Sequence, residues 1–225
     1  MMAIFSATRV GPGGAELIAS GDQSAARPAI KMTIVSERID TPDFPYDLAS
    51  TVIADRHDLS RVFSSMATSH DWNGLTAKRF TGGGKPRFEA WSTWGIPEVE
   101  RELPADVVPL EAVPLFLRAM DFSTTASFRC LPTLMAHRLP WSSVVPEPGV
   151  PTLQAAVDGE ETTTTAAGTF DCYRVKVTTS DGRVPMVLWY EKVFPNRLVY
   201  KTTISGKVFS LRGSERRRLA PSDPR

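Results

Sequence analysis

The sequence predicts a mainly β protein in which a single large, curved antiparallel sheet forms a β-barrel or β-clam, with one short helix near residues 110–120. Two observations lead to this fold class. Short apolar runs separated by turn residues recur along most of the chain. The order is strands, one helix, then strands, and the lack of strand–helix alternation argues against a parallel sheet. A long antiparallel sheet of this kind curves until it closes or nearly closes.

The clearest strands lie between Ala166 and Leu211, where runs of β-branched and aromatic residues are separated by Asp-Gly, Pro-Asn and Ser-Gly pairs. Such pairs are typical of tight turns between antiparallel strands. The strands expected here cover residues 168–177, 186–193, 198–204 and 208–211. Together they predict an antiparallel meander.

The N-terminal part of the chain carries a weaker version of the same pattern. Strands are expected over residues 5–10, 30–39, 48–56, 61–68, 75–81 and 87–94. The pair Asn73-Gly74 is a strong hairpin signal between two of these strands. Beyond the helix, we expect extended structure over residues 128–139 and a strand near 152–157. The final meander follows them.

One segment, from Ala105 to Met120, shows the helical period instead. Its apolar residues recur at spacings of three and four: Val108, Ala112, Leu115, Phe116 and Ala119. Pro109 and Pro114 limit its regularity, because a proline inside a helix removes a hydrogen bond and clashes with the preceding turn. We therefore expect a helix of roughly two to three turns at this position.

Composition and charge narrow the function classes. The chain is expected to form one domain over residues 1–212, followed by a disordered basic tail over 213–225. A formal net charge of +1 gives no electrostatic reason to expect nucleic acid or an anionic membrane as a partner. No apolar run is long enough to span a bilayer. No secretion signal is visible at the start, so a cytoplasmic protein is expected; the alternative is an exported protein whose leader has been removed.

The sequence holds no recognisable metal or cofactor motif. Cys130 and Cys172 lie in expected strands, either as buried thiols or as a disulfide between neighbouring strands, and a reducing compartment favours the thiols. His57 is interpreted as a polar residue at a strand end rather than a metal ligand. The glycines at 82–84 lack the spacing of a phosphate-binding loop. We expect neither a metal nor a cofactor.

Bulky residues fall on both faces of two expected strands. In the first, Phe88 and Trp94 share one face while Glu89 and Trp91 share the other. In the second, over residues 186–193, the faces are Met186, Leu188, Tyr190 and Lys192 on one side and Val187, Trp189, Glu191 and Val193 on the other. A strand in a simple two-layer sheet has one mainly polar face. Large groups on both sides therefore indicate that one face packs on the helix or an outer layer while the other lines an interior.

The interior of a closed sheet is either filled by side chains or open to one ligand. If it is open, its lining is predicted to include Phe88, Trp91, Trp94, Tyr173, Met186 and Leu188, a composition usual in small-molecule pockets. The polar side chains expected to orient or polarise a bound substrate are Tyr190, Glu89, Arg129 and His137. In the alternative interpretation, the aromatic residues only fill the core.

Three motifs resemble a bacterial domain family of uncharacterised function, many of whose members are exported β proteins. They are the helix exit Leu117-Arg118-Ala119-Met120-Asp121-Phe122, the run over residues 166–175, and Leu188-Trp189-Tyr190 followed by Pro195-Asn196-Arg197. The resemblance runs from about residue 48 to residue 211. It implies a clam-like or barrel-like antiparallel sheet, similar to lipoprotein carriers, wrapped partly around a helix.

Two functions fit these observations. In the first, a cofactor-independent enzyme folds a long hydrophobic, polyketide-like substrate in its cavity and catalyses a cyclisation or isomerisation. Confinement would supply most of the rate enhancement, because reactants held in place lose most of their entropic barrier. Barrel proteins of this general shape catalyse such cyclisations, which is an analogy of fold. In the second, the protein is a non-catalytic carrier or sensor of a hydrophobic ligand or lipid.

Overall fold

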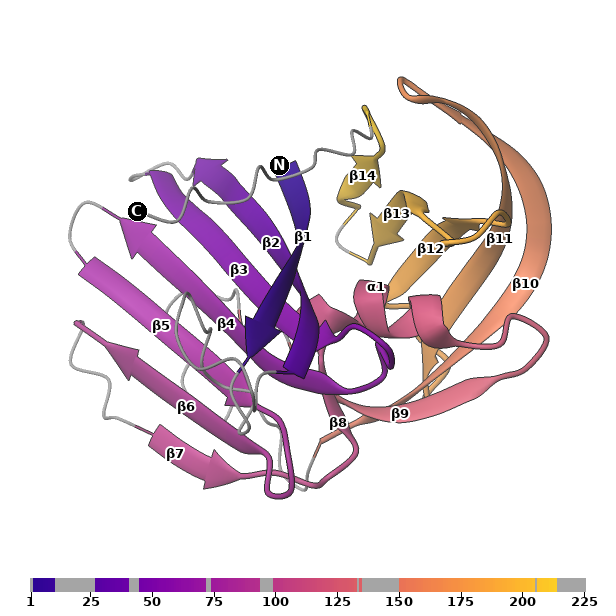
Figure 1. Cartoon of the computed structure of the whole chain (residues 1–225). Helices are drawn as coiled ribbons and strands as arrows, with labels where there is room; N and C mark the ends of the chain where they lie inside the picture. The colour runs from indigo at the N-terminus through magenta and orange to yellow at the C-terminus, as the bar shows by residue number, and fades with distance from the viewer. Residues whose placement is uncertain are drawn as a thin grey trace, which may run out of the picture.

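The computed structural model describes residues 2–10, 27–40, 45–71, 74–93, 99–132, 134, 150–204 and 206–213. Within this part of the chain the protein is mainly β, with two seven-stranded sheets on either side of one short helical segment (Figure 1). The predicted fold class, mainly antiparallel β with a helix between the strands, is confirmed. The strands are divided between two sheets rather than joined in one.

The first sheet contains β1 to β7 in chain order, and each strand pairs antiparallel with the next. Its strands are β1 (Met2–Val10), β2 (Arg27–Asp40), β3 (Pro45–Asp55), β4 (Val62–Asp71), β5 (Gly74–Thr81), β6 (Arg87–Ser92) and β7 (Val99–Glu102). The hairpin predicted next to Gly74 is confirmed, because Asp71 pairs with Gly74 across the β4–β5 turn. The short charged strand β7 is absent from the sequence prediction.

The second sheet contains β8 to β14, again with neighbours in chain order. Its strands are β8 (Val107–Pro109), β9 (Ala126–Leu131), β10 (Thr152–Thr165), β11 (Gly168–Thr179), β12 (Met186–Glu191), β13 (Leu198–Thr203) and β14 (Val208–Ser210). Only β8 and β9, among the described strands, pair in parallel, because the helical segment connects them. The long strands β10 and β11 curve round in Figure 1, which gives this sheet the form of a half-barrel.

The helical segment lies where the sequence predicts it and is built from three short pieces. The 3₁₀ turn η1 (Leu110–Ala112) leads into α1 (Val113–Phe116), and the 3₁₀ turn η2 (Leu117–Ala119) ends it. Pro114 lies in the first turn of α1, where a proline costs no helical hydrogen bond. Pro109 is the N-cap of η1, so both prolines stand where a helical piece begins.

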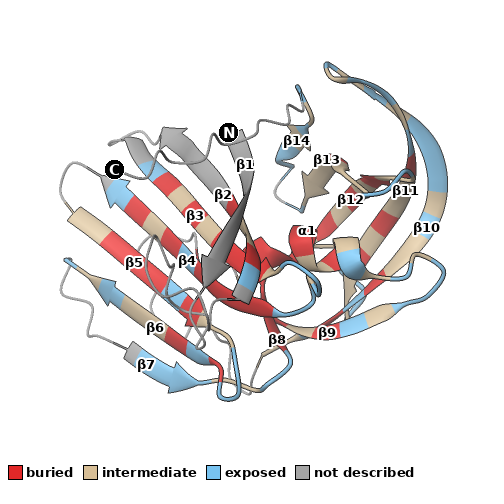
Figure 2. Cartoon of the chain, viewed as in Figure 1, coloured by how far each residue is buried: buried red, intermediate tan, exposed pale blue. Residues whose placement is uncertain are grey.

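The helical segment and both sheets share one hydrophobic core. Buried residues from the first sheet, such as Val52 and Phe88, belong to the same cluster as Leu115 of α1 and Val175 and Leu188 of the second sheet. The buried positions concentrate on the inner faces of the sheets and on the helix (Figure 2). The space between the sheets therefore holds the helix and the side chains packed on it.

Two further expectations concern the cysteines and the membrane. Cys130 on β9 and Cys172 on β11 are both buried free thiols, so the disulfide alternative does not hold. In the described ranges, no helix is long and apolar enough to cross a membrane. The predicted basic tail lies outside the described residues, apart from Gly213 at its start.

Candidate functional site

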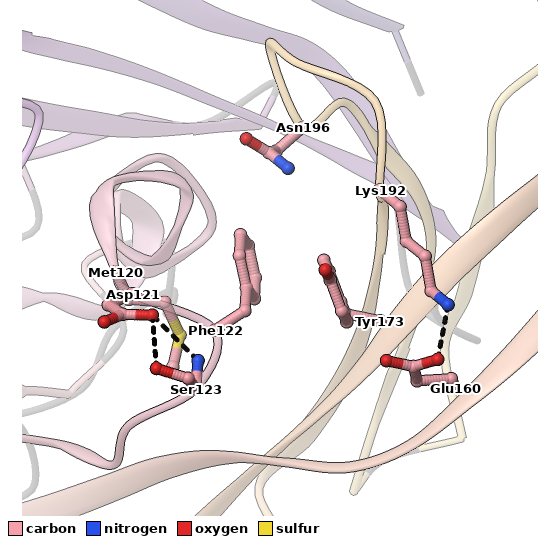
Figure 3. Close-up of a pocket in the computed structure, with 8 residues that line it drawn as sticks. All are labelled: Met120, Asp121, Phe122, Ser123, Glu160, Tyr173, Lys192 and Asn196. Carbon is pink, nitrogen blue, oxygen red and sulfur yellow. Dashed lines mark hydrogen bonds and ion pairs between the residues drawn. The ribbon is translucent and has the colours of Figure 1, made fainter.

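An open hollow of about 480 Å³ lies on the face of the second sheet that also carries the helical segment (Figure 3). Four of its residues follow the helix, and the others come from β10, β11 and the turn after β12. The lining residues are Met120, Asp121, Phe122, Ser123, Glu160, Tyr173, Lys192 and Asn196. The hollow is therefore formed where the helix exit meets the half-barrel.

The apolar part of the hollow is a stack of two aromatic rings. Phe122 lies parallel to Tyr173, with 4.8 Å between ring centroids and 13° between the planes. Phe122 also meets Tyr190 at 5.7 Å and 50°. Such offset and tilted pairs are favourable beyond the area they bury. The stack holds the helix exit against β11 and β12.

The position of Phe122 is fixed by the turn around it. Asp121 accepts hydrogen bonds through Oδ1 from the backbone N–H of Ser123 at 2.9 Å and from its hydroxyl at 2.7 Å. These two hydrogen bonds lower the pKa of Asp121, so its carboxylate is charged at neutral pH. Since this turn starts directly after η2, it orients Phe122 toward the sheet.

The polar part of the hollow is an ion pair between β10 and the turn after β12. Lys192 donates to Glu160, and its ammonium lies 5.4 Å from the centroid of the Tyr173 ring (Figure 3). The hydrogen bond to Glu160 raises the pKa of Lys192, so the ammonium remains charged. A fixed positive charge thus lies beside an aromatic surface, an arrangement favourable for cation–π contact.

The turn after β12 is tied to the helix. Arg118 of η2 donates two hydrogen bonds to the carbonyl oxygen of Pro195, at 2.7 and 3.2 Å. Asn196, at a positive φ of 53° that asparagine tolerates, donates through its side-chain amide to the carbonyl of Glu191 at 3.1 Å. These contacts fix the rim of the hollow on the side of Asn196.

The structure describes three of the four predicted catalytic residues and places them on different strands, with separate partners. Tyr190 is fully buried and donates from its hydroxyl to the carbonyl oxygen of Pro114 at 2.8 Å. Glu89 lies on the other sheet, where it accepts from Arg79 at 2.7 Å. The guanidinium of Arg129 on β9 donates to Asp106 at 2.9 Å. His137 lies outside the described residues.

Tyr190, in particular, is placed as a packing residue. Burial raises the pKa of its phenol well above the ordinary value, and the positive charge of Arg118 lowers it only in part. Its hydroxyl is therefore neutral at physiological pH and is used in a contact with the helix backbone. Tyr190 supports the hollow through Phe122 and is not among its lining residues.

The predicted substrate-binding residues are divided between core, surface and hollow. Phe88, Met186 and Leu188 are buried in the shared core. Trp91 is 42% exposed, on the face of β6 opposite Phe88. Tyr173 lines the hollow, and Trp94 lies outside the described residues.

Sequence reasoning missed the helix exit as a source of site residues. Met120 and Phe122 belong to the helix-exit motif, which indicates an architecture and not a binding site. A signal for Lys192 was present, because alternation along the expected strand over 186–193 places it on the same face as Tyr190. The residues of the hollow come together through pairing between strands and through packing of the helix exit on the sheet, and a single sequence displays neither.

Comparison with known proteins assigns no family. No family model matches the sequence, and no curated protein matches it. Among solved structures, the chain is similar to a putative lipoprotein from Parabacteroides distasonis ATCC 8503, at 13% identity over 91% of this chain and 89% of the other. The TM-score is 0.22. This value is too low to transfer a family or a function to this chain.

Proposed function

We propose that the protein binds an amphipathic small molecule in the hollow between the helix exit and the half-barrel, as a carrier or sensor. The observation that carries the proposal is the lining, which joins the stacked rings of Phe122 and Tyr173 to the ion pair of Lys192 and Glu160. Pockets for small molecules combine an apolar surface with a few placed polar groups. The apolar part of the ligand would lie on Phe122 and Met120, with its polar end at Lys192.

Binding is favoured over turnover by where the polar groups lie. A confinement cyclase needs its hydrogen-bonding groups around one substrate. The hydroxyl of Tyr190 is committed to the carbonyl of Pro114, and Glu89 and Arg129 lie in separate ion pairs elsewhere. The cyclase hypothesis stays a prediction. The carrier hypothesis needs only the hollow that the described residues form.

The proposal is tested with a fluorescent long-chain carboxylic acid as the probe. Phe122→Ala and Tyr173→Ala each remove one ring of the stack, so we expect each to weaken probe binding about tenfold or more, the scale of losing a buried aromatic surface. Trp91→Ala removes an aromatic side chain of the other sheet and serves as the matched control. We expect it to bind the probe as the unmodified protein does.

The affinities of the variants for the probe decide whether the ligand binds in this hollow. Equal affinities for the Phe122→Ala and Trp91→Ala variants would contradict the assignment of the hollow, provided that both unfold at midpoints close to that of the unmodified protein. Native mass spectrometry of the purified chain supplies a second measurement. We expect a co-purifying lipid-like mass that is lost in Phe122→Ala and retained in Trp91→Ala.

A further inference from the structure

The turn that forms one rim of the hollow presents two apolar side chains to solvent. Val193 is 69% exposed and Phe194 is 87% exposed. Lys192 and Asn196, on either side of the pair in the chain, both line the hollow. The most exposed aromatic side chain of the described residues therefore lies at the mouth of the candidate site.

The backbone of this turn is held in place. The N–H of Asn196 donates to the carbonyl of Val193 at 2.9 Å, and Arg118 donates to the carbonyl of Pro195. Arg197 donates twice to the carboxylate of Glu191, at 2.7 and 3.0 Å, and that carboxylate side chain is only 13% exposed. An exposed apolar group on an ordered turn loses little conformational freedom on binding, so it is suited to recognition.

We propose that this turn, which we call the Phe194 turn (residues 193–195), docks on a lipid bilayer. Phe194 and Val193 would enter the interfacial region, where aromatic side chains are favoured. The mouth of the hollow would then face the membrane. Transfer of the ligand between membrane and hollow rests on the proposed function, whereas docking itself does not.

Two arguments favour a bilayer over a protein partner. A specific protein interface buries about 800 Å² on each partner, far more than two adjacent side chains at the tip of a turn provide. A bilayer needs no shape complementarity, so a narrow apolar tip suffices for weak, reversible contact. The charges beside the turn are balanced in pairs, Lys192 with Glu160 and Arg197 with Glu191. Docking is therefore expected on neutral lipid and should depend little on salt.

The test uses the full chain and vesicles of phosphatidylcholine alone, with flotation as the measurement. Phe194→Ser is expected to lower the partition coefficient about tenfold, the scale of losing a buried aromatic side chain. Val193→Ser is expected to have a smaller effect in the same direction. Ile204→Ser is the matched control, because Ile204 is 70% exposed and lies just past the opposite end of β13. It should partition as the unmodified protein does.

The proposal is overturned if the unmodified chain does not float with vesicles, or if Phe194→Ser and Ile204→Ser partition equally. A second contrary outcome is self-association through Phe194 in place of vesicle binding. It would appear in sedimentation as a dimer that the Phe194→Ser substitution abolishes. Failure of the docking proposal can be distinguished from failure of the proposed function, because the two depend on different residues. Phe194→Ser should keep its affinity for the soluble probe, whereas Phe122→Ala should lose the probe and still bind vesicles.

Discussion

At the scale of single residues, Tyr190 shows how one side chain joins the half-barrel to the helix. Its ring packs beside Phe122, and its hydroxyl satisfies the carbonyl of Pro114 in the interior. A buried carbonyl without a donor would cost about 1–3 kcal/mol. The hydroxyl therefore stabilises the helix position, and it does so only while the phenol stays protonated.

This dependence gives a prediction for Tyr190→Phe. Below pH 10, the phenol is protonated in both folded and unfolded chains, so the variant should be less stable by about 1 kcal/mol for the lost hydrogen bond. Above the ordinary pKa of 10.0, the unfolded phenol loses its proton while the buried one, whose pKa is raised by desolvation, keeps it. The free energy of unfolding of the unmodified protein then falls by about 1.4 kcal/mol per pH unit from this group.

Urea unfolding from pH 8 to pH 11 measures this effect as the difference in free energy of unfolding between the unmodified protein and the Tyr190→Phe variant. Burial also raises the pKa of Cys130, which adds an alkaline loss of stability common to both proteins and cancels in the comparison. The stability gap should therefore narrow with rising pH. A gap that stays constant to pH 11 would show that Tyr190 does not titrate differently in the folded state.

At the scale of elements, the helical segment depends on tertiary contacts rather than on its own stability. None of its three pieces has a side-chain cap hydrogen bond, and it holds a proline. Its residues Val113, Leu115 and Leu117 are completely buried. Glu111 is also buried and accepts the N–H of Leu134 at 2.7 Å. The segment is therefore positioned by packing and by one buried carboxylate.

Glu111 acts on Lys78 of the first sheet, and this pair gives the second prediction. Desolvation lowers the pKa of the buried Lys78, and the charge of Glu111 partly restores it. Glu111→Ala removes this charge and also the buried acceptor of the Leu134 N–H, so it should destabilise the protein by about 1–3 kcal/mol. Lys78→Met should cost a similar amount, and the double variant less than the sum of the two.

A double-mutant cycle measured by urea unfolding checks this coupling. The exposed pair of Arg87 and Glu100 is the control, because surface ion pairs contribute less than about 1 kcal/mol. Glu100→Ala should thus have little effect. Strictly additive effects of the Glu111 and Lys78 substitutions would show that the two charges do not interact.

At the scale of the whole molecule, the fold was predictable where its signals are local. Alternation and turn pairs located most strands, and the spacing of three and four located the helix. The division into two sheets was not predictable, because it depends on β7 and β8, consecutive in the chain, ending different sheets instead of pairing with each other. The strand β7, with the residues Val99 to Glu102, is too short and too charged to show a β pattern.

The candidate site was only partly predictable for the same reason. Tyr173 was expected in a pocket and lines the hollow. Its stacking partner Phe122 is far away in sequence and meets it only through the packing of the helix exit on β11. The prediction of an interior cavity assumed one closed sheet. In the structure, Phe88, Met186 and Leu188 are instead buried in the core that the two sheets share. Long-range packing thus decided which aromatic residues fill the core and which remain accessible.

The shared core leads to a last prediction, that the two sheets unfold together. Buried residues of both sheets contact one helix, so loss of either sheet would expose the apolar surface of the other. Two variants that retain only Trp91 or only Trp189 report on the first and second sheet by fluorescence. Their urea midpoints should coincide. Leu115 is completely buried, so Leu115→Ala should lower the free energy of unfolding by about 3 kcal/mol and shift both midpoints by the same amount. Separate midpoints would instead show two sheets that unfold independently, and the helix would then belong to the sheet whose midpoint Leu115→Ala moves.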